Sequence, residues 1–217
     1  MSFYYRLPAA LIVATIASVQ PEFALAQLSA QQVEEIDRNQ CNPSGEIDFN
    51  EAIRLNPNDA EAYNGRGVVR YDQGDIEGAL ADLNETIRLA PSYAEAYRNR
   101  GYLRSQQEDI QGVIADFNEA IRLEPSYAGA YINRGVVRYN QGDIQGAIAD
   151  YNEAIRLDPN DGDAYYNRAL VRNEQRDIQG AINDFQKASE LYQQDGNADS
   201  YRDAQNAIRE LQKELEV

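Results

Sequence analysis

AGAYINRGVVRYNQGDIQGAIADYNEAIRLDPND, residues 128–161, is the cleanest copy of a block that recurs every 34 residues. The block before it, residues 94–127, reads AEAYRNRGYLRSQQEDIQGVIADFNEAIRLEPSY, and residues 60–93 read AEAYNGRGVVRYDQGDIEGALADLNETIRLAPSY. The block after it, residues 162–195, reads GDAYYNRALVRNEQRDIQGAINDFQKASELYQQD. A fixed period of this length is typical of stacked helical hairpins, so the sequence predicts an all-α solenoid with four full repeats.

Certain positions of the block keep their character in the four copies. An aromatic residue near the start is Tyr63, Tyr97, Tyr131 and Tyr165. Two small positions hold Gly67, Gly101, Gly135 and Ala169, and then Ala79, Val113, Ala147 and Ala181. A large apolar position holds Leu83, Phe117, Tyr151 and Phe185, and a proline follows at Pro91, Pro125 and Pro159, with Gln193 in the last copy. This pattern resembles the tetratricopeptide repeat, and the resemblance implies a right-handed α-solenoid of helix-turn-helix units, each with a helix A and a helix B.

Two positions of helix A depart from that family's pattern. Where the family has a Leu and a Tyr, each repeat has an Arg, as in Arg134 and Arg138 of the third repeat. Like charges four residues apart on a helix repel one another. Because each helix B also carries one Asp at a fixed place, we predict that the first Arg of each pair forms an ion pair with that Asp. The alternative is a strip that binds anions. The pairs are Arg66 with Asp82, Arg100 with Asp116, Arg134 with Asp150, and Arg168 with Asp184.

Helix ends can be predicted from turn and capping residues. We expect Asn58 to cap the first helix A while Glu61 reaches back to it, with Ser92 and Glu95 repeating the arrangement. Helix A should end near Gly74 or Gly142, where a left-handed residue is needed. Glu108 and Arg176 hold the same place in the second and fourth repeats and should make those turns less favourable. We expect helix B to be capped by Asp75, Asp109, Asp143 and Asp177.

The repeats are flanked by segments of different character. Residues 46–57, EIDFNEAIRLNP, match the second half of a repeat, so a partial repeat is expected within residues 27–59. Residues 196–217 carry an apolar stripe at helical spacing on an otherwise charged segment. We predict that this segment is a helix that covers the apolar face of the last repeat. The stripe consists of Tyr201, Ala204, Ile208, Leu211 and Leu215.

Residues 1–26 have the pattern of a secretory signal peptide. Arg6 precedes an apolar run over residues 8–19, and Ala24-Leu25-Ala26 forms an A-x-A cleavage site before Gln27. We therefore expect a mature chain that begins at Gln27 and lies in the periplasm, a lumen or the extracellular space, without stable membrane insertion. The alternative is a buried N-terminal helix or an uncleaved anchor.

Composition argues against several kinds of chemistry. The chain has 36 acidic and 20 basic side chains, a net charge of −16, no His, and a single Cys, Cys41. Binding of nucleic acid needs a basic face, so nucleic acid is not an expected partner. The lone thiol has no histidine to act as its base, and the carboxylates repeat with the structural period. We therefore expect a non-enzyme that uses no cofactor and no metal ion.

In the tetratricopeptide repeat family, helix A lines a concave groove that binds partners. The resemblance places four positions of each repeat on that groove, and the aromatic and apolar ones among them suggest an adhesive surface. Some relatives clamp a terminal carboxylate with Lys, Asn and Arg, but only Asn99 fits such a clamp here. The predicted partner-binding residues are Asn64, Val68, Tyr71, Arg98, Tyr102, Ile132, Val136, Tyr139, Tyr166 and Leu170.

These observations predict a scaffold or adaptor for another protein. The expected partner is an extended peptide or a helix with apolar residues and basic flanks, because acidic side chains such as Glu95 and Asp163 border the predicted surface. Such a scaffold could serve the assembly of an envelope or membrane complex. An alternative of another class is a structural module that associates with itself through its ends.

Overall fold

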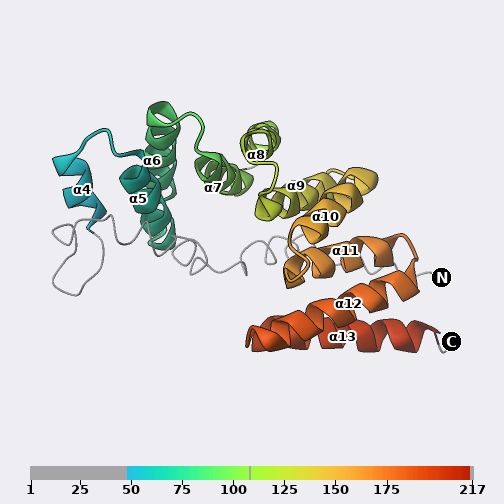
Figure 1. Cartoon of the computed structure of the whole chain (residues 1–217). Coiled ribbons are helices and arrows are strands. Elements are labelled where there is room, and N and C mark those ends of the chain that lie inside the picture. The colour runs from blue at the N-terminus through green and yellow to red at the C-terminus, as the bar shows by residue number, and fades with distance from the viewer. Residues whose placement is uncertain (1–47, 108, 216–217) are drawn as a thin grey trace. The chain divides into compact units, whose positions relative to one another are not determined.

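The computed structural model describes residues 48–107 and 109–215, and the predicted signal peptide, Cys41 and Glu108 lie outside these residues. The chain divides into two compact parts, one ending at Leu103 and one beginning at Arg104. We call their described residues the N-terminal part and the C-terminal part, and describe each by itself. Within the described residues all regular structure is α-helical (Figure 1), which confirms the predicted all-α class.

The N-terminal part holds a half repeat followed by helical hairpins. Helix α4 (Phe49–Leu55) is the half repeat, and α5 (Ala60–Asp72) and α6 (Ile76–Leu89) are helices A and B of the first full repeat. Helix α7 (Ala94–Ser105) begins the second repeat. Side chains of α6 and α7 form one buried cluster of Ala79, Leu83, Ala96 and Leu103.

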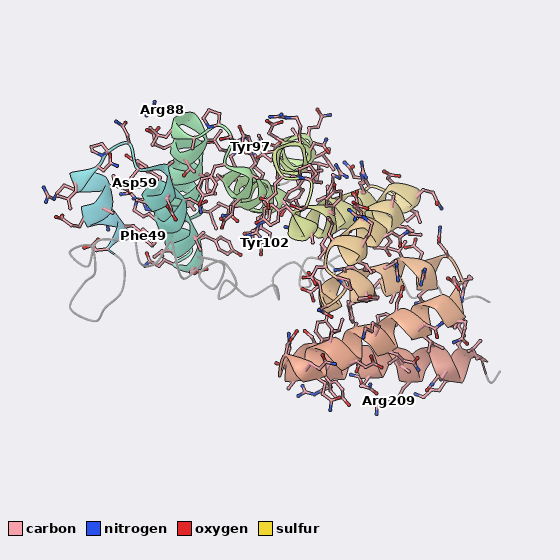
Figure 2. The ribbon with its side chains drawn as sticks, in the orientation of Figure 1. Phe49, Asp59, Arg88, Tyr97, Tyr102 and Arg209 are labelled. Atoms are coloured by element: carbon pink, nitrogen blue, oxygen red, sulfur yellow. The ribbon has the colours of Figure 1, made fainter. Side chains whose placement is uncertain are left out.

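The half repeat packs directly on the first full repeat. The ring of Phe49 lies so close to Gly65 that a Cβ atom there would be 2.4 Å from it. Figure 2 labels Phe49 on α4. The other full repeats have Asn99, Asn133 and Asn167 at this position. Gly65 thus makes room for the ring of Phe49.

The C-terminal part completes the array. It contains α8 (Ile110–Leu123), α9 (Ala128–Asn140), α10 (Ile144–Leu157), α11 (Gly162–Glu174), α12 (Ile178–Gln194) and α13 (Ala198–Leu215). Helix α10 packs against α9 and α11, and α12 packs against α11 and α13. Helix α13 buries Ala204, Ile208 and Leu211, as predicted, and the latter two share a cluster with Phe185 of α12. Leu215, the last residue of the predicted stripe, is exposed at the end of the helix.

Small residues let helices A and B approach closely. A Cβ atom at Gly135 would lie 2.6 Å from the ring of Tyr151, which is 1% exposed. At Gly67 the corresponding neighbour is Leu83, at 3.3 Å. A side chain at Gly135 would therefore clash with Tyr151 more severely than one at Gly67 would with Leu83. The larger the residue in helix B, the less space is left for a side chain opposite it.

The predicted ends of the helices are partly confirmed. The four aspartates expected to cap helix B do so, each accepting a hydrogen bond from a glycine N–H three residues on. Gly74 and Gly142 have φ of 81° and 80°, and Arg176 adopts φ of 64° at the equivalent place. The cap predicted for the first helix A is wrong. Asp59 caps α5 by accepting a hydrogen bond from Ala62 N–H, because the helix begins at Ala60, one residue later than a cap at Asn58 requires.

Candidate functional site

Two arginines and one aspartate meet inside the hairpins. In the third repeat, Arg134 Nε and Nη2 donate to the carboxylate of Asp150 at 2.9 and 2.6 Å. Arg138 Nη1 donates to the same carboxylate at 2.8 Å. Asp150 is 2% exposed, so its charge is compensated inside the fold rather than by water. The same three-residue clamp joins Arg66 and Arg70 to Asp82, and Arg168 and Arg172 to Asp184.

This clamp confirms the predicted pairing in those three repeats and adds a second arginine that the prediction did not include. In the second repeat, Arg104 pairs with Asp116 at 2.8 Å. The remaining nitrogen of the first arginine is also used. Arg134 Nη1 donates to Asn118 of the preceding repeat at 2.7 Å, and its guanidinium lies 5.5 Å from the ring centre of Tyr131. A strip that binds anions would need available guanidinium groups, so these contacts favour a structural role.

Two of the predicted partner-binding residues of the N-terminal part, Tyr71 and Tyr102, contact each other. The hydroxyls of Tyr71 and Tyr102 are 3.1 Å apart, and their rings meet edge to face with centroids 5.5 Å apart. Both rings are partly exposed and pack on the buried cluster beneath them. Tyr102 is labelled in Figure 2. We call this pair the tyrosine pair.

Amide groups lie near the start of α5 and α7. Asn99 Nδ2 donates to Asn64 Oδ1 at 3.2 Å, and Arg98 Nη2 donates to Asn99 Oδ1 at 2.8 Å. Asn64 is only 6% exposed. Four predicted residues are thus held by polar contacts within the N-terminal part, namely Asn64, Arg98, Tyr71 and Tyr102. Asn64 is buried, so the expectation that it offers binding surface is corrected, whereas Val68 is partly exposed.

In the C-terminal part, two of the predicted residues belong to the interior. Ile132 and Val136 are 6% and 4% exposed, because α8, α10 and α11 all pack against the helix that carries them. The expectation that they offer binding surface is therefore corrected. Tyr139, Tyr166 and Leu170 remain partly exposed.

The two C-terminal tyrosines are held in different surroundings. Tyr166 packs edge to face on Phe185, with centroids 5.1 Å apart, and burial raises the pKa of its hydroxyl. Burial and the nearby carboxylate of Glu174 raise the pKa of Tyr139. Both hydroxyls therefore stay neutral near neutral pH.

One polar contact was not anticipated from the sequence. Tyr192 Oη donates to Asp163 Oδ1 at 2.6 Å. The sequence feature that points to this contact is the absence of a proline in the last repeat. Without that proline, α12 continues to Gln194 and places Tyr192 near the start of α11. Asp163 was expected only as part of an acidic border.

The described residues offer little for other kinds of chemistry. They contain no group of three or more His, Cys, Asp or Glu side chains placed to hold a metal ion. None of the helices in residues 48–107 and 109–215 combines the length and apolar character needed to cross a membrane.

Comparison with protein families identifies the repeat. The family model described as TPR repeat matches residues 48–74, 67–108 and 137–175, and the model described as Tetratricopeptide repeat matches residues 162–195. This chain belongs to the tetratricopeptide repeat family. Tetratricopeptide repeat (TPR) scaffolds are generally not enzymes, and their fold supports interactions between proteins.

Solved structures show the same fold. A structure of MamA is 26% identical in sequence to this TPR protein. The match covers 69% of this chain and 87% of the MamA chain, with a TM-score of 0.60. TTC0263 of Thermus thermophilus is 20% identical, with coverage of 74% and 87% and a TM-score of 0.64. YrrB, described as a TPR protein with an unusual peptide-binding site, is 20% identical, with coverage of 76% and 92% and a TM-score of 0.57. A comparison with curated protein sequences gives no match.

Proposed function

We propose that this TPR protein is an exported scaffold that binds an extended segment or a helix of another protein on its A helices. The observation that carries the proposal is the tyrosine pair of α5 and α7. Two aromatic rings are held rigidly against a buried cluster and keep part of their surface exposed. Rigid aromatic side chains are the usual energetic centre of a protein interface.

Charge supports a particular kind of partner. The chain carries a net charge of −16, and Glu61 and Glu95 lie in the first turns of the two helices that carry the tyrosine pair. A partner with basic residues beside its apolar anchor would be attracted to this surface, most strongly at low salt. YrrB, a protein of the same fold, is described as having a peptide-binding site, and the proposal extends a role of that kind to this chain.

Short peptides of defined charge test the proposal. Peptides with an apolar centre and Lys or Arg flanks should bind the chain, and matched peptides with Asp or Glu flanks should bind more weakly. Tyr71→Ala combined with Tyr102→Ala should weaken binding of the basic peptides about thirtyfold, the effect of losing about 2 kcal/mol at an aromatic anchor. Fluorescence anisotropy at two salt concentrations measures both effects.

Matched variants separate binding from folding. Tyr71→Phe with Tyr102→Phe keeps both rings and should keep most of the affinity. Glu85→Ala with Arg88→Ala removes an exposed ion pair of α6, away from the tyrosine pair, and should leave binding unchanged. If the alanine double variant is folded and binds the peptides as well as the parent does, the tyrosine pair is not the binding surface.

The proposal includes the compartment. The signal-peptide pattern of residues 1–26 supports export to the periplasm, a lumen or the extracellular space, where the mature chain would begin at Gln27. In such a compartment the scaffold would serve the assembly of an envelope or membrane complex.

A further inference from the structure

The last hairpin contains a contact that the other repeats lack. Helix α12 has 17 residues, whereas helix B of each of the other full repeats has 14. The extra turn brings the ring of Tyr192 against Gly162, where a Cβ atom would lie 2.9 Å from it. The Tyr192 hydroxyl donates to Asp163 at 2.6 Å, so the end of α12 is fastened to the start of α11.

Two carboxylates, those of Asp161 and Asp163, stand at the start of α11 where this contact is made. Asp161 caps α11 by accepting hydrogen bonds from the N–H groups of Asp163 and Ala164, and Asp163 follows it in the first turn. Neither carboxylate forms an ion pair within the described residues of the C-terminal part. The charged groups that act on them are acidic, namely Asp158 at the end of α10 and Asp195 at the end of α12.

The remaining neighbours add no compensating charge. Tyr166 of α11 lies 6.3 Å from Tyr192 between ring centroids, and Asp203 of α13 acts on Tyr166. The side chains that act on the two carboxylates are thus one tyrosine, Tyr192, and other carboxylates.

The first repeat provides an internal comparison. Asp59 caps α5 as Asp161 caps α11, through the N–H three residues on. There α6 ends at Leu89, and Ala90 stands where the last repeat has Tyr192. Glu61, which takes the place of Asp163, is exposed. The first repeat thus lacks both the tyrosine and the partly buried second carboxylate of the longer hairpin.

We propose that Asp161, Asp163 and Tyr192 form a proton-controlled latch, which tightens the attachment of α12 to α11 as the pH falls from neutral to mildly acidic. At neutral pH both carboxylates are charged, close together and partly removed from water. Protonation of one relieves their repulsion and the cost of burying charge, and this gain outweighs the weakening of the hydrogen bonds that the carboxylate accepts. The latch makes the C-terminal hairpin more stable in an acidic compartment.

The direction of the effect follows from proton linkage. Burial first, and the neighbouring charge of Asp163 second, raise the pKa of Asp161 from 3.8 to about 6, and burial raises that of Asp163. The folded state therefore binds more protons than the unfolded state between these values. Its stability rises as the pH falls through this window and drops again as the pH rises.

Hydrogen exchange of individual amides tests the latch on the intact chain. Protection of α11 and α12, relative to protection of α9 and α10, should rise about tenfold between pH 7 and pH 5 after correction for intrinsic exchange. The hairpin of α9 and α10 is the reference because it has Gly129 in place of Asp163 and no tyrosine in place of Tyr192. A carboxyl carbon titration by NMR should show Asp161 titrating near pH 6.

Three variants distinguish the latch from a general effect of charge. Asp161→Asn with Asp163→Asn keeps a capping side chain and should abolish the relative gain in protection. Tyr192→Phe removes a hydrogen bond that lowers the pKa of Asp163, so the gain should begin at a higher pH. Asp59→Asn, at the matching cap of α5, should leave the gain unchanged.

The contrary result is equally clear. If both carboxylates titrate at the ordinary value of about 4, or if the relative protection of α11 and α12 does not rise toward pH 5, there is no latch. The latch is also excluded if the double asparagine variant gains as much protection as the parent.

Discussion

Arg134 shows how a charged side chain can stand where the family pattern has a leucine. Its stem lies between helices, its guanidinium lies over Tyr131, and its nitrogens bond to Asp150 and to Asn118. A planar guanidinium can serve these partners at once, whereas the ammonium of a lysine cannot form the same fork. This explains why an arginine rather than a lysine stands at this position.

The clamp predicts strong coupling between its members. Asp150→Ala leaves Arg134 and Arg138 facing each other with no carboxylate between them and should cost about 3–5 kcal/mol. In a double-mutant cycle with Arg134→Ala, the losses should be non-additive by about 1–3 kcal/mol. Urea unfolding of the four proteins measures the coupling. The exposed pair of Glu153 and Arg156 on the same helix is the control, and its cycle should show no measurable coupling. Additive losses at Arg134 and Asp150 would contradict the clamp.

The turn between helices A and B gives a second residue-level prediction. Gly142 has positive φ, and no atom would lie within 4 Å of a Cβ added there, so Gly142→Ala tests backbone strain alone and should cost about 1 kcal/mol. Arg176→Gly should relieve a strain of the same size, less the small contribution of its exposed ion pair with Glu214. Thermal unfolding of both variants, with Arg176→Gly repeated in a Glu214→Gln background, checks the signs. A Gly142→Ala protein more stable than the parent would show that strain at this turn is not the deciding term.

Residue-level features differ in how far the sequence predicts them. The pairing of Arg134 with Asp150 was predictable because both recur at a fixed spacing. The part played by Arg138 was not, because it depends on where the carboxylate lies between two turns of α9. The burial of Ile132 and Val136 also escaped prediction, since periodicity gives the face of a helix but not how closely its neighbours approach.

At the scale of elements, α12 and α13 differ most from the repeat. Without a proline, α12 gains a turn, and α13 then covers it with an apolar stripe whose opposite face is charged. The stripe and its helix were predictable from spacing alone. The contact between Tyr192 and the start of α11 was not, because it joins residues 29 positions apart through the extra turn.

The cover provided by α13 can be tested in two steps. Ile208→Ala removes a buried side chain that is 6% exposed and should cost about 2–5 kcal/mol. Removal of residues 197–217 should expose the cluster around Phe185, so that hydrogen exchange in α11 and α12 becomes faster than in α9 and α10. Equal protection of the two hairpins in the truncated chain would contradict a covering role for α13.

Helix α4, the first of the described helices, also departs from the repeat pattern. It retains only the later turns of a helix B, and Asp48, which stands where a full repeat has its clamp aspartate, instead caps the helix through Asn50 and Glu51 N–H. The sequence predicted the partial repeat from its match to a full one. It did not predict the new use of Asp48, because that use depends on where the helix begins.

At the scale of the whole molecule, export is the property to test. If Ala24-Leu25-Ala26 is a cleavage site, protein isolated from its own host should begin at Gln27. Intact mass and N-terminal sequencing measure this directly. Replacing Ala24 and Ala26 with bulky residues should block processing and leave the longer form. A native protein that retains residues 1–26 would contradict the signal-peptide prediction.

The bonds of Arg134 and Arg168 to an asparagine 16 residues earlier use the same atoms in successive repeats. A second copy of residues 128–161, inserted directly after Asp161, would therefore find its partners on both sides. At the far end, Gln186 replaces that asparagine and Arg202 pairs with Asp199 instead. Gene duplication can thus lengthen this array from within by repeating one arginine–asparagine bond, whereas α13 packs on α12 without that bond.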